Sequence, residues 1–227
     1  MSQKLTILFD LDGTLVNTAP DLMRAHNYVM KKYGYDERKL SDIKKLAGRG
    51  SKVMLTRSMH DMAELSGKIK KTDDIVEKMT KEFIDFYSKN IAKESTLKNG
   101  VLDFLAWCKK KSILMGVCTN KQEHLSVDLL KKIKIYHFFD YVAGGNTFNH
   151  NKPDPRHLTD IIEIVGGDIN KTLMIGDSET DSNASKAANI PFILIKDGYT
   201  EKNTNEIYHD YLVRDFIGVE KIIEKYL

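Results

Sequence analysis

The chain has 227 residues, of which 41% are hydrophobic and 30% are charged, and its formal net charge at pH 7 is +3. These values are ordinary for a globular protein with a sizeable core, and the near balance of charge gives no reason to expect a nucleic-acid partner. The sequence shows neither a signal-peptide pattern nor an apolar run of membrane-spanning length. Since Cys108 and Cys118 form no CxxC pair, we expect reduced thiols in a cytoplasmic protein without a membrane partner.

Short apolar runs alternate with segments of helical periodicity along most of the chain. The predicted strands cover residues 4–9, 112–119, 139–143, 172–175, 192–195 and 211–213. Between and after them, helices are predicted within residues 101–106, 125–133, 158–165 and 217–226. This alternation is typical of βαβ units, so we expect an α/β fold with a Rossmann-like parallel sheet.

One long segment interrupts the alternation. From residue 17 to about residue 90 the chain is polar, rich in lysine and methionine, and helical by pattern, most clearly in the stretch 72–90. We therefore expect an all-helical unit over residues 16–91, inserted after the first strand. The remaining residues, 1–15 and 92–227, would form the α/β core.

Polar motifs lie at or near the ends of the predicted strands. They contain Asp10 and Asp12 after the first strand, then Thr119-Asn120-Lys121, then Lys152 in "HNKPDP", and finally Asp177 and Asp181 in "GDSETD". Ligands of open α/β sheets bind outside the carboxyl ends of the strands. All four motifs can therefore converge on one crevice.

The chemistry of these residues is complementary. Asp10 and Asp177 can bind a hard cation such as Mg²⁺, which prefers oxygen ligands, and that cation would offset the crowding of Asp10 and Asp12. Groups suited to phosphate oxygens are the side chains of Thr119 and Lys152 and the backbone amides near Gly13 and Asn120. Together they predict a site for phosphoryl transfer.

This constellation resembles the haloacid dehalogenase superfamily of phosphohydrolases. The stretches "DLDGTLV", "CTNK", "KPDP" and "GDSETD" are similar, in order, to its four motifs. The resemblance covers the predicted α/β core, and the helical segment occupies the position of that family's small mobile cap. It implies a Mg²⁺-dependent phosphomonoester hydrolase that acts through an aspartyl-phosphate on a small phosphorylated metabolite.

The resemblance also implies a role for each motif residue. Asp10 would be the nucleophile, and Asp12 would be the general acid for the leaving oxygen and then the base for water. The metal would be bound by Asp10, by the backbone carbonyl of Asp12 and by Asp177, while Asp181 orients a metal-bound water or the catalytic lysine. The residues expected to stabilise the transferring phosphoryl group are Thr119 and Lys152.

Within the family, three stretches look like the phosphoglycolate phosphatase branch, which implies 2-phosphoglycolate or a similar small ester as substrate. They are "TNK", "AGGNTFNHNKPDPRHL" and "GDSETDSNASKAANI", with Asn146 standing where relatives often have Asp. The stretch "LAGRG", residues 46–50, falls where this family has its substrate-reading loop. There Gly48 and Gly50 would allow a tight turn, and Arg49 would pair with a substrate carboxylate.

Other readings stay open. Asp12 favours a phosphatase over a dehalogenase, which needs no such acid, and "TNK" argues against a β-phosphoglucomutase-like phosphotransferase. A broad phosphatase for nucleotides or pyrophosphate would use the same residues, and a binding module would keep the pocket without turnover. The sequence leaves both a monomer and a homodimer open.

Overall fold

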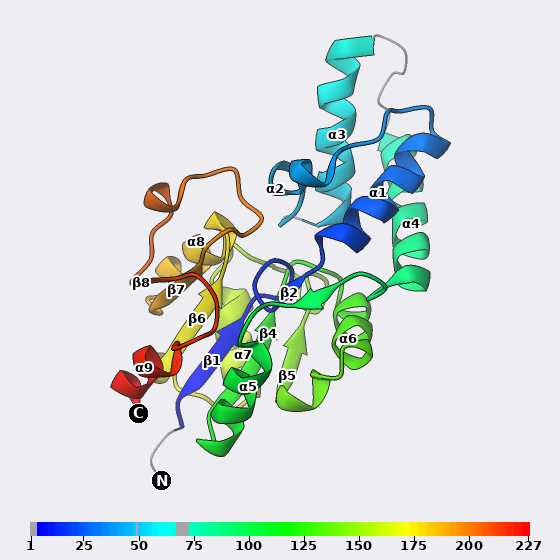
Figure 1. Cartoon of the computed structure of the whole chain (residues 1–227). Coiled ribbons are helices and arrows are strands. Elements are labelled where there is room, and N and C mark those ends of the chain that lie inside the picture. The colour runs from blue at the N-terminus through cyan, green and yellow to red at the C-terminus, as the bar shows by residue number, and fades with distance from the viewer. Residues whose placement is uncertain (1–3, 49, 67–72) are drawn as a thin grey trace.

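A parallel sheet forms the centre of the fold. The computed structural model describes residues 4–48, 50–66 and 73–227, and in this part of the chain the sheet has six strands in the order β5-β4-β1-β6-β7-β8 (Figure 1). The strands are β1 (Thr6–Phe9), β4 (Leu114–Cys118), β5 (Tyr141–Ala143), β6 (Thr172–Gly176), β7 (Phe192–Ile195) and β8 (Tyr211–Val213). Because the chain first extends the sheet on one side of β1 and then on the other, β1 lies at the point where the strand order reverses.

Helices cover both faces of this sheet. Residues of β1 alternate between the two faces: Ile7 and Phe9 pack in one core cluster with α5, α6 and α9, and Leu8 packs in a second cluster with α7 and α8. These helices are α5 (Val101–Lys110), α6 (Glu123–Lys132), α7 (Arg156–Ile164), α8 (Glu179–Ala187) and α9 (Glu220–Ile223). A strand buried on both faces is mostly apolar, which is why β1 shows no polar alternation, and its one polar residue, Thr6, is itself buried.

Among the described residues, four further α-helices precede α5 in the sequence. They are α1 (Ala19–Lys32), α2 (Ile43–Leu46), α3 (Ser51–Ser66) and α4 (Asp73–Asn90). Helix α4 packs against both α1 and α3, and Figure 1 shows these helices together beyond the end of the sheet at which β1 ends. We call them the helical insert. The predicted fold class, a Rossmann-like parallel sheet with an all-helical insert after the first strand, is confirmed.

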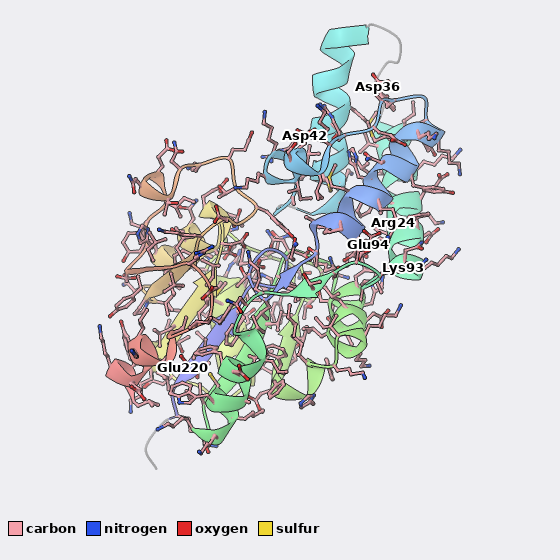
Figure 2. The ribbon with its side chains drawn as sticks, in the orientation of Figure 1. Arg24, Asp36, Asp42, Lys93, Glu94 and Glu220 are labelled. Carbon is pink, nitrogen blue, oxygen red and sulfur yellow. The ribbon has the colours of Figure 1, made fainter. Side chains whose placement is uncertain are left out.

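A short antiparallel ribbon joins the insert to the sheet. Its strands, β2 (Val16–Asn17) and β3 (Thr96–Leu97), pair at the two crossings of the chain. Next to the ribbon, the buried carboxylate of Asp21 accepts the backbone N–H groups of Glu94 at 3.1 Å and Ser95 at 3.0 Å. Arg24 forms ion pairs with both Asp21 and Glu94, and Figure 2 labels Arg24 and Glu94 at this junction. The division at residues 15/16 and 91/92 stays a prediction.

The predicted helix over residues 217–226 is wrong in its length. The α-helix there covers only Glu220–Ile223 and continues as a 3₁₀ turn over Glu224–Tyr226. Gly218 has a φ of +79°, a left-handed conformation that a right-handed helix cannot contain, so the helix begins after it. Among the described helices, none is long and apolar enough to cross a membrane.

Substitution of Phe104 by Ala tests the packing under β1. The ring of Phe104 is fully buried, with centroid distances of 6.2 Å to Phe9 and 5.4 Å to Phe216. Since truncation leaves a cavity, we expect Phe104→Ala to lower the free energy of unfolding by about 3–5 kcal/mol. Leu102→Ala, on the same helix but 51% exposed, should change it by about 0.5 kcal/mol at most. Equal effects of the two substitutions in urea denaturation would contradict this packing.

Candidate active site

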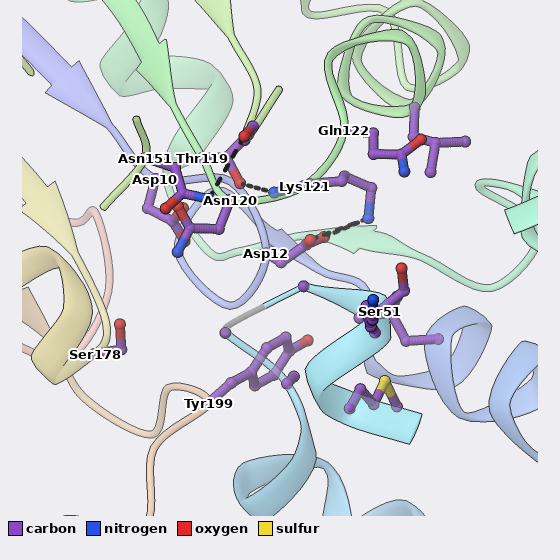
Figure 3. Close-up of a pocket in the computed structure, with 18 of the residues that line it drawn as sticks. Asp10, Asp12, Ser51, Thr119, Asn120, Lys121, Gln122, Asn151, Ser178 and Tyr199 are labelled. Atoms are coloured by element: carbon purple, nitrogen blue, oxygen red, sulfur yellow. Dashed lines mark hydrogen bonds and ion pairs between the residues drawn. The ribbon is translucent and has the colours of Figure 1, made fainter. Parts of the chain in front are cut away.

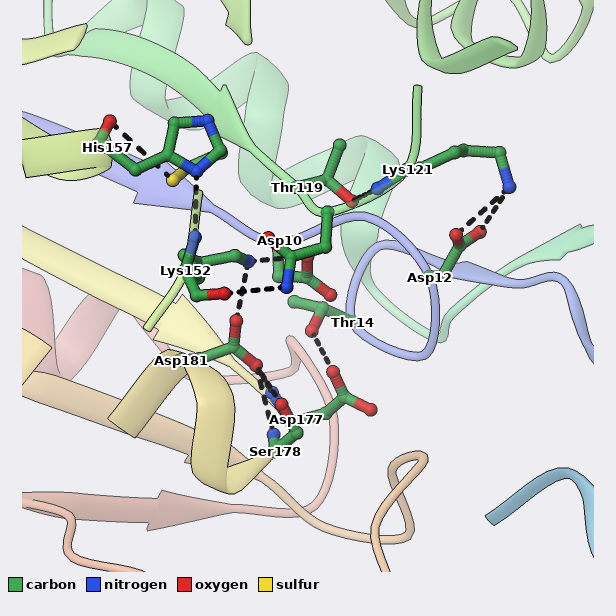
Figure 4. A network of polar contacts seen from close by, with 12 residues as sticks. Asp10, Asp12, Thr14, Thr119, Lys121, Lys152, His157, Asp177, Ser178 and Asp181 are labelled. Atoms are coloured by element: carbon green, nitrogen blue, oxygen red, sulfur yellow. Dashed lines mark hydrogen bonds and ion pairs between the residues drawn. The ribbon is translucent and has the colours of Figure 1, made fainter. Parts of the chain in front are cut away.

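Asp10 is the first residue after β1 and is almost fully buried. Its backbone N–H donates to the carbonyl of Ile175 in β6 at 2.9 Å, so the sheet still fixes its main chain. Its side chain accepts a hydrogen bond from Lys152 Nζ at 2.7 Å. The carboxylate is therefore held at the carboxyl end of the central strand (Figure 4).

Lys152 lies between two carboxylates. It comes from the loop between β5 and α7, is 3% exposed, and places Nζ 2.7 Å from Asp10 Oδ1 and 2.6 Å from Asp181 Oδ1. Its backbone N–H donates to His157 Nδ1 at 3.2 Å, and its carbonyl accepts from Asn120 Nδ2 at 2.9 Å. Burial lowers the pKa of Lys152, but Asp10 and Asp181 outweigh burial and raise it, so the lysine stays charged.

Asp177 and Asp181 flank the start of α8. Asp181 Oδ2 accepts the Ser178 hydroxyl at 2.7 Å and the backbone N–H groups of Ser178 and Asp177 at 3.1 and 3.2 Å. These contacts form a capping box, which satisfies donors that a helix start leaves free. Asp177 accepts the hydroxyl of Thr14 at 2.8 Å and the backbone N–H of Tyr199 at 2.6 Å. Neither carboxylate is free to rotate away.

Gly13 permits the close approach of the loop after β1 to Asp177. Its φ is +91°, and a Cβ at this position would lie 2.3 Å from Asp177 Oδ2. A side chain would therefore displace the carboxylate or the loop. The absence of a side chain at Gly13 therefore leaves room for the Asp177 carboxylate, while the contact of nearby backbone amides with phosphate stays a prediction.

Three buried carboxylates lie close enough to share a cation. Asp10, Asp177 and Asp181 each offer an oxygen, and these oxygens lie within 4.8 Å of one another. Burial raises the pKa of Asp10 to about 6, although Lys152 opposes that shift, and burial together with Asp10 raises the pKa of Asp177 well above its usual range. When all three carboxylates are ionised, their negative charge exceeds the single positive charge of Lys152, and an all-oxygen donor set suits Mg²⁺. The residues present fit that ion.

The carboxylate of Asp12 points to a different partner. It accepts hydrogen bonds from Lys121 Nζ at 3.0 and 3.1 Å and is not a member of the three-carboxylate cluster (Figure 4). The assignment of its backbone carbonyl to a metal stays a prediction. The pairing with Lys121 was not predicted, although "TNK" contains this lysine.

A cavity of about 360 Å³ lies between the sheet end and the helical insert (Figure 3). Of the predicted site residues, those that line it are Asp10, Asp12, Gly48, Thr119, Asn120, Asp177 and Asp181. Gly13 lies next to Asp177, and Lys152 contacts Asp10, so both adjoin residues that line the cavity. Arg49 lies outside the described residues. The sequence analysis did not anticipate Tyr87 of α4 or Tyr199, which also line the cavity, because single aromatic residues carry no motif.

Two further hydrogen bonds are made by residues that line the cavity, Tyr199 and Asn146. The hydroxyl of Tyr199 accepts the N–H of Ala19, the first residue of α1, at 2.8 Å, which connects the loop beside Asp177 with the helical insert. Asn146 Oδ1 accepts the N–H of Glu123, the first residue of α6, at 2.8 Å. The amide of Asn146 therefore offers this N–H an acceptor oxygen, as an aspartate at that position would.

Comparisons with known proteins agree with this geometry. Residues 7–195 match the family model "Haloacid dehalogenase-like hydrolase". The chain is 36% identical over 210 residues to a phosphoglycolate phosphatase of Mesorhizobium japonicum, covering 92% of this chain and 90% of the relative. It is 35% identical over 217 residues to a phosphoglycolate phosphatase of Caulobacter vibrioides, and the match covers 95% of this chain and 89% of that relative. The crystal structure of a predicted phosphoglycolate phosphatase from Haemophilus somnus is similar, with a TM-score of 0.91 and 27% sequence identity. The match covers 98% of this chain and 99% of that one.

Mg²⁺ should stabilise the protein in a pH-dependent way. Folding raises the pKa of Asp10 from 3.8 to about 6, so without a cation its contribution to the free energy of unfolding falls as pH rises through that interval. Mg²⁺ would bind the ionised carboxylates, and a ligand at about 100 times its Kd raises the free energy of unfolding by about 2.7 kcal/mol. We expect a melting-temperature increase of about 5–10 °C near pH 7.5 and a much smaller one near pH 5. An equal increase at both pH values, or in Asp177→Asn, would contradict this site.

Proposed function

The chain belongs to the haloacid dehalogenase-like hydrolase family, and we propose that it hydrolyses 2-phosphoglycolate or a similar small phosphate ester, with Mg²⁺ as cofactor. The family, predicted from the four motifs, and its phosphoglycolate phosphatase-like branch, predicted from three stretches of the sequence, are confirmed, as is the prediction of a phosphatase. The activity for which the relatives are named supports this choice of substrate. The remaining support comes from the arrangement of Asp10 and Asp12.

The observation that carries the proposal is the separation of these two carboxylates. They are two residues apart and line the same cavity, yet each is paired with a different buried lysine. Asp10 contacts Lys152, and Asp12 contacts Lys121. Two carboxylates in different environments can take two different roles, one as nucleophile and the other in proton transfer.

We assign the covalent step to Asp10. An oxygen of its carboxylate attacks phosphorus, the bond from phosphorus to the leaving oxygen breaks, and Asp12 as its acid gives a proton to that oxygen. In the second step Asp12 takes a proton from water, which attacks the phosphorus of the aspartyl-phosphate. The bond between Asp10 and phosphorus then breaks, which releases phosphate and restores the carboxylate.

Positive charge is needed around the phosphoryl group during its transfer, because both the phosphate oxygens and the nearby carboxylates are negatively charged. Asp10 and Asp177 would hold Mg²⁺, which would supply charge to offset the carboxylates and the phosphate oxygens. Lys152 supplies a fixed cation 2.7 Å from the nucleophile, and Asp181 keeps it in that position. The hydroxyl of Thr119 lines the same cavity and would bind a phosphate oxygen.

The helical insert gives the cavity its second wall. Met54 of α3 and Phe83 and Tyr87 of α4 are buried side chains that line it, opposite the polar sheet end. An apolar wall excludes water from the reacting phosphoryl group and contacts the leaving group rather than the phosphate. The insert is therefore the part of the molecule that would select among phosphate esters.

Phosphate release over a panel of esters tests the proposed substrate. With Mg²⁺ present, we expect 2-phosphoglycolate to have a higher kcat/KM than sugar phosphates, nucleoside monophosphates or pyrophosphate, because the relatives that match most of the chain are named phosphoglycolate phosphatases. A flat profile would instead indicate a broad phosphatase. Transfer of phosphate to a sugar rather than to water would indicate a phosphotransferase like β-phosphoglucomutase, and the absence of any release would indicate a binding module.

Asp10→Asn tests the nucleophile. An amide oxygen is a poor nucleophile, so we expect phosphate release to fall by about 10³-fold or more while the melting temperature stays within a few degrees. The matched control is Asp103→Asn, which removes an exposed carboxylate on α5 and should leave release unchanged. Activity of Asp10→Asn near that of the control would refute a covalent role for Asp10.

A further inference from the structure

Lys121 is a buried cation on the wall of the cavity to which the motifs assign no role. It is 8% exposed, it precedes α6, and its backbone N–H donates to Thr119 Oγ1 at 3.2 Å. Its Nζ lies 3.0 Å from Asp12 Oδ2 and 4.4 Å from the ring centroid of Tyr87 in α4. The ammonium group is therefore positioned between the sheet end and the helical insert, as Figure 3 shows for its contact with Asp12.

This position adjoins the leaving group. In the proposed reaction Asp12 contacts the leaving oxygen, so a group hydrogen-bonded to Asp12 lies beside that oxygen. The carboxylate of 2-phosphoglycolate is separated from the leaving oxygen by a single carbon atom. A substrate placed with its leaving oxygen on Asp12 therefore brings its carboxylate within reach of Lys121 Nζ.

Lys121 also has hydrogen-bonding capacity left for a ligand. An ammonium group has three N–H donors, and the two oxygens of Asp12 take at most two of them. Tyr87, which also lines the cavity, has a buried hydroxyl that interacts with Lys121. A carboxylate bound here would accept from the lysine and could accept from this hydroxyl as well.

The other lysines near the cavity are less suited to this role. Lys152 is already shared by Asp10 and Asp181. Lys52 lines the cavity, but its side chain is 59% exposed and forms an ion pair with Glu77 at 3.3 Å. A buried cation discriminates more strongly than an exposed one, because water does not screen its charge.

We propose that Lys121 is a specificity-determining residue that binds the carboxylate of the substrate's leaving group. This inference rests on the proposed function, since it places the leaving oxygen on Asp12. A bound ester without a carboxylate offers no acceptor to the third N–H donor of Lys121, which lies in the buried wall of the cavity. Such an ester therefore binds less well, although its phosphate contacts are the same.

The test compares 2-phosphoglycolate with ethyl phosphate, which has the same two-carbon leaving group without the carboxylate. We expect the wild-type protein to prefer 2-phosphoglycolate, and we expect Lys121→Met to lower the ratio of the two kcat/KM values by about tenfold or more, chiefly through KM for 2-phosphoglycolate. The matched control is Lys131→Met, at the other end of α6. Lys131 is an exposed lysine whose Nζ lies 5.2 Å from the ring centroid of Tyr136, and its loss should leave the ratio unchanged.

The outcomes separate this inference from the proposed function. A wild-type protein that shows no preference would overturn the proposed substrate and this inference with it. A wild-type preference that survives in Lys121→Met would overturn the inference alone, even if kcat falls equally for both esters, since Lys121 would then only position Asp12. If Lys121→Met does not fold, the same ratio measured in Lys121→Gln decides, because its amide can still donate to Asp12 but carries no charge.

Discussion

The site depends on one buried ion-pair arrangement, in which the ammonium group of Lys152 lies between Asp10 and Asp181. Its Nζ joins Asp10, directly after β1, to Asp181 in the first turn of α8, and these two residues are 171 positions apart in the sequence. Removing either partner from water is costly unless its charge is matched and its hydrogen bonds are made. Here the loop contacts of Lys152 with Asn120 and His157, and the capping box around Asp181, keep the three groups in contact.

The sheet topology brings these groups together without long side chains. Because β4 and β6 are the neighbours of β1, their carboxyl ends place Thr119 and Asp177 on either side of Asp10. The sequence was sufficient to predict this much, since strand ends in a parallel sheet share an edge and each motif follows or lies close to a predicted strand. The fold class and the convergence of the four motifs could be predicted for that reason.

Other features of the structure correspond to no pattern in the sequence. The ribbon of β2 and β3 has two residues in each strand, too few for a periodicity, and the late start of the last helix depends on the backbone of Gly218. The contact of Lys121 with Asp12 and Tyr87 needs the helical insert to be placed against the sheet, which no local pattern specifies. The sequence therefore predicted which residues meet at the end of the sheet better than it predicted their contacts with the helical insert.

The most direct test of this account is whether Asp10 itself becomes phosphorylated. Acetyl phosphate has a leaving group that needs no proton, so Asp12→Asn should still form the aspartyl-phosphate and should hydrolyse it slowly. After rapid acid quenching, mass spectrometry should find one added phosphoryl group on the peptide that contains Asp10. An unmodified peptide at every reaction time, while phosphate is still released, would contradict the covalent role of Asp10.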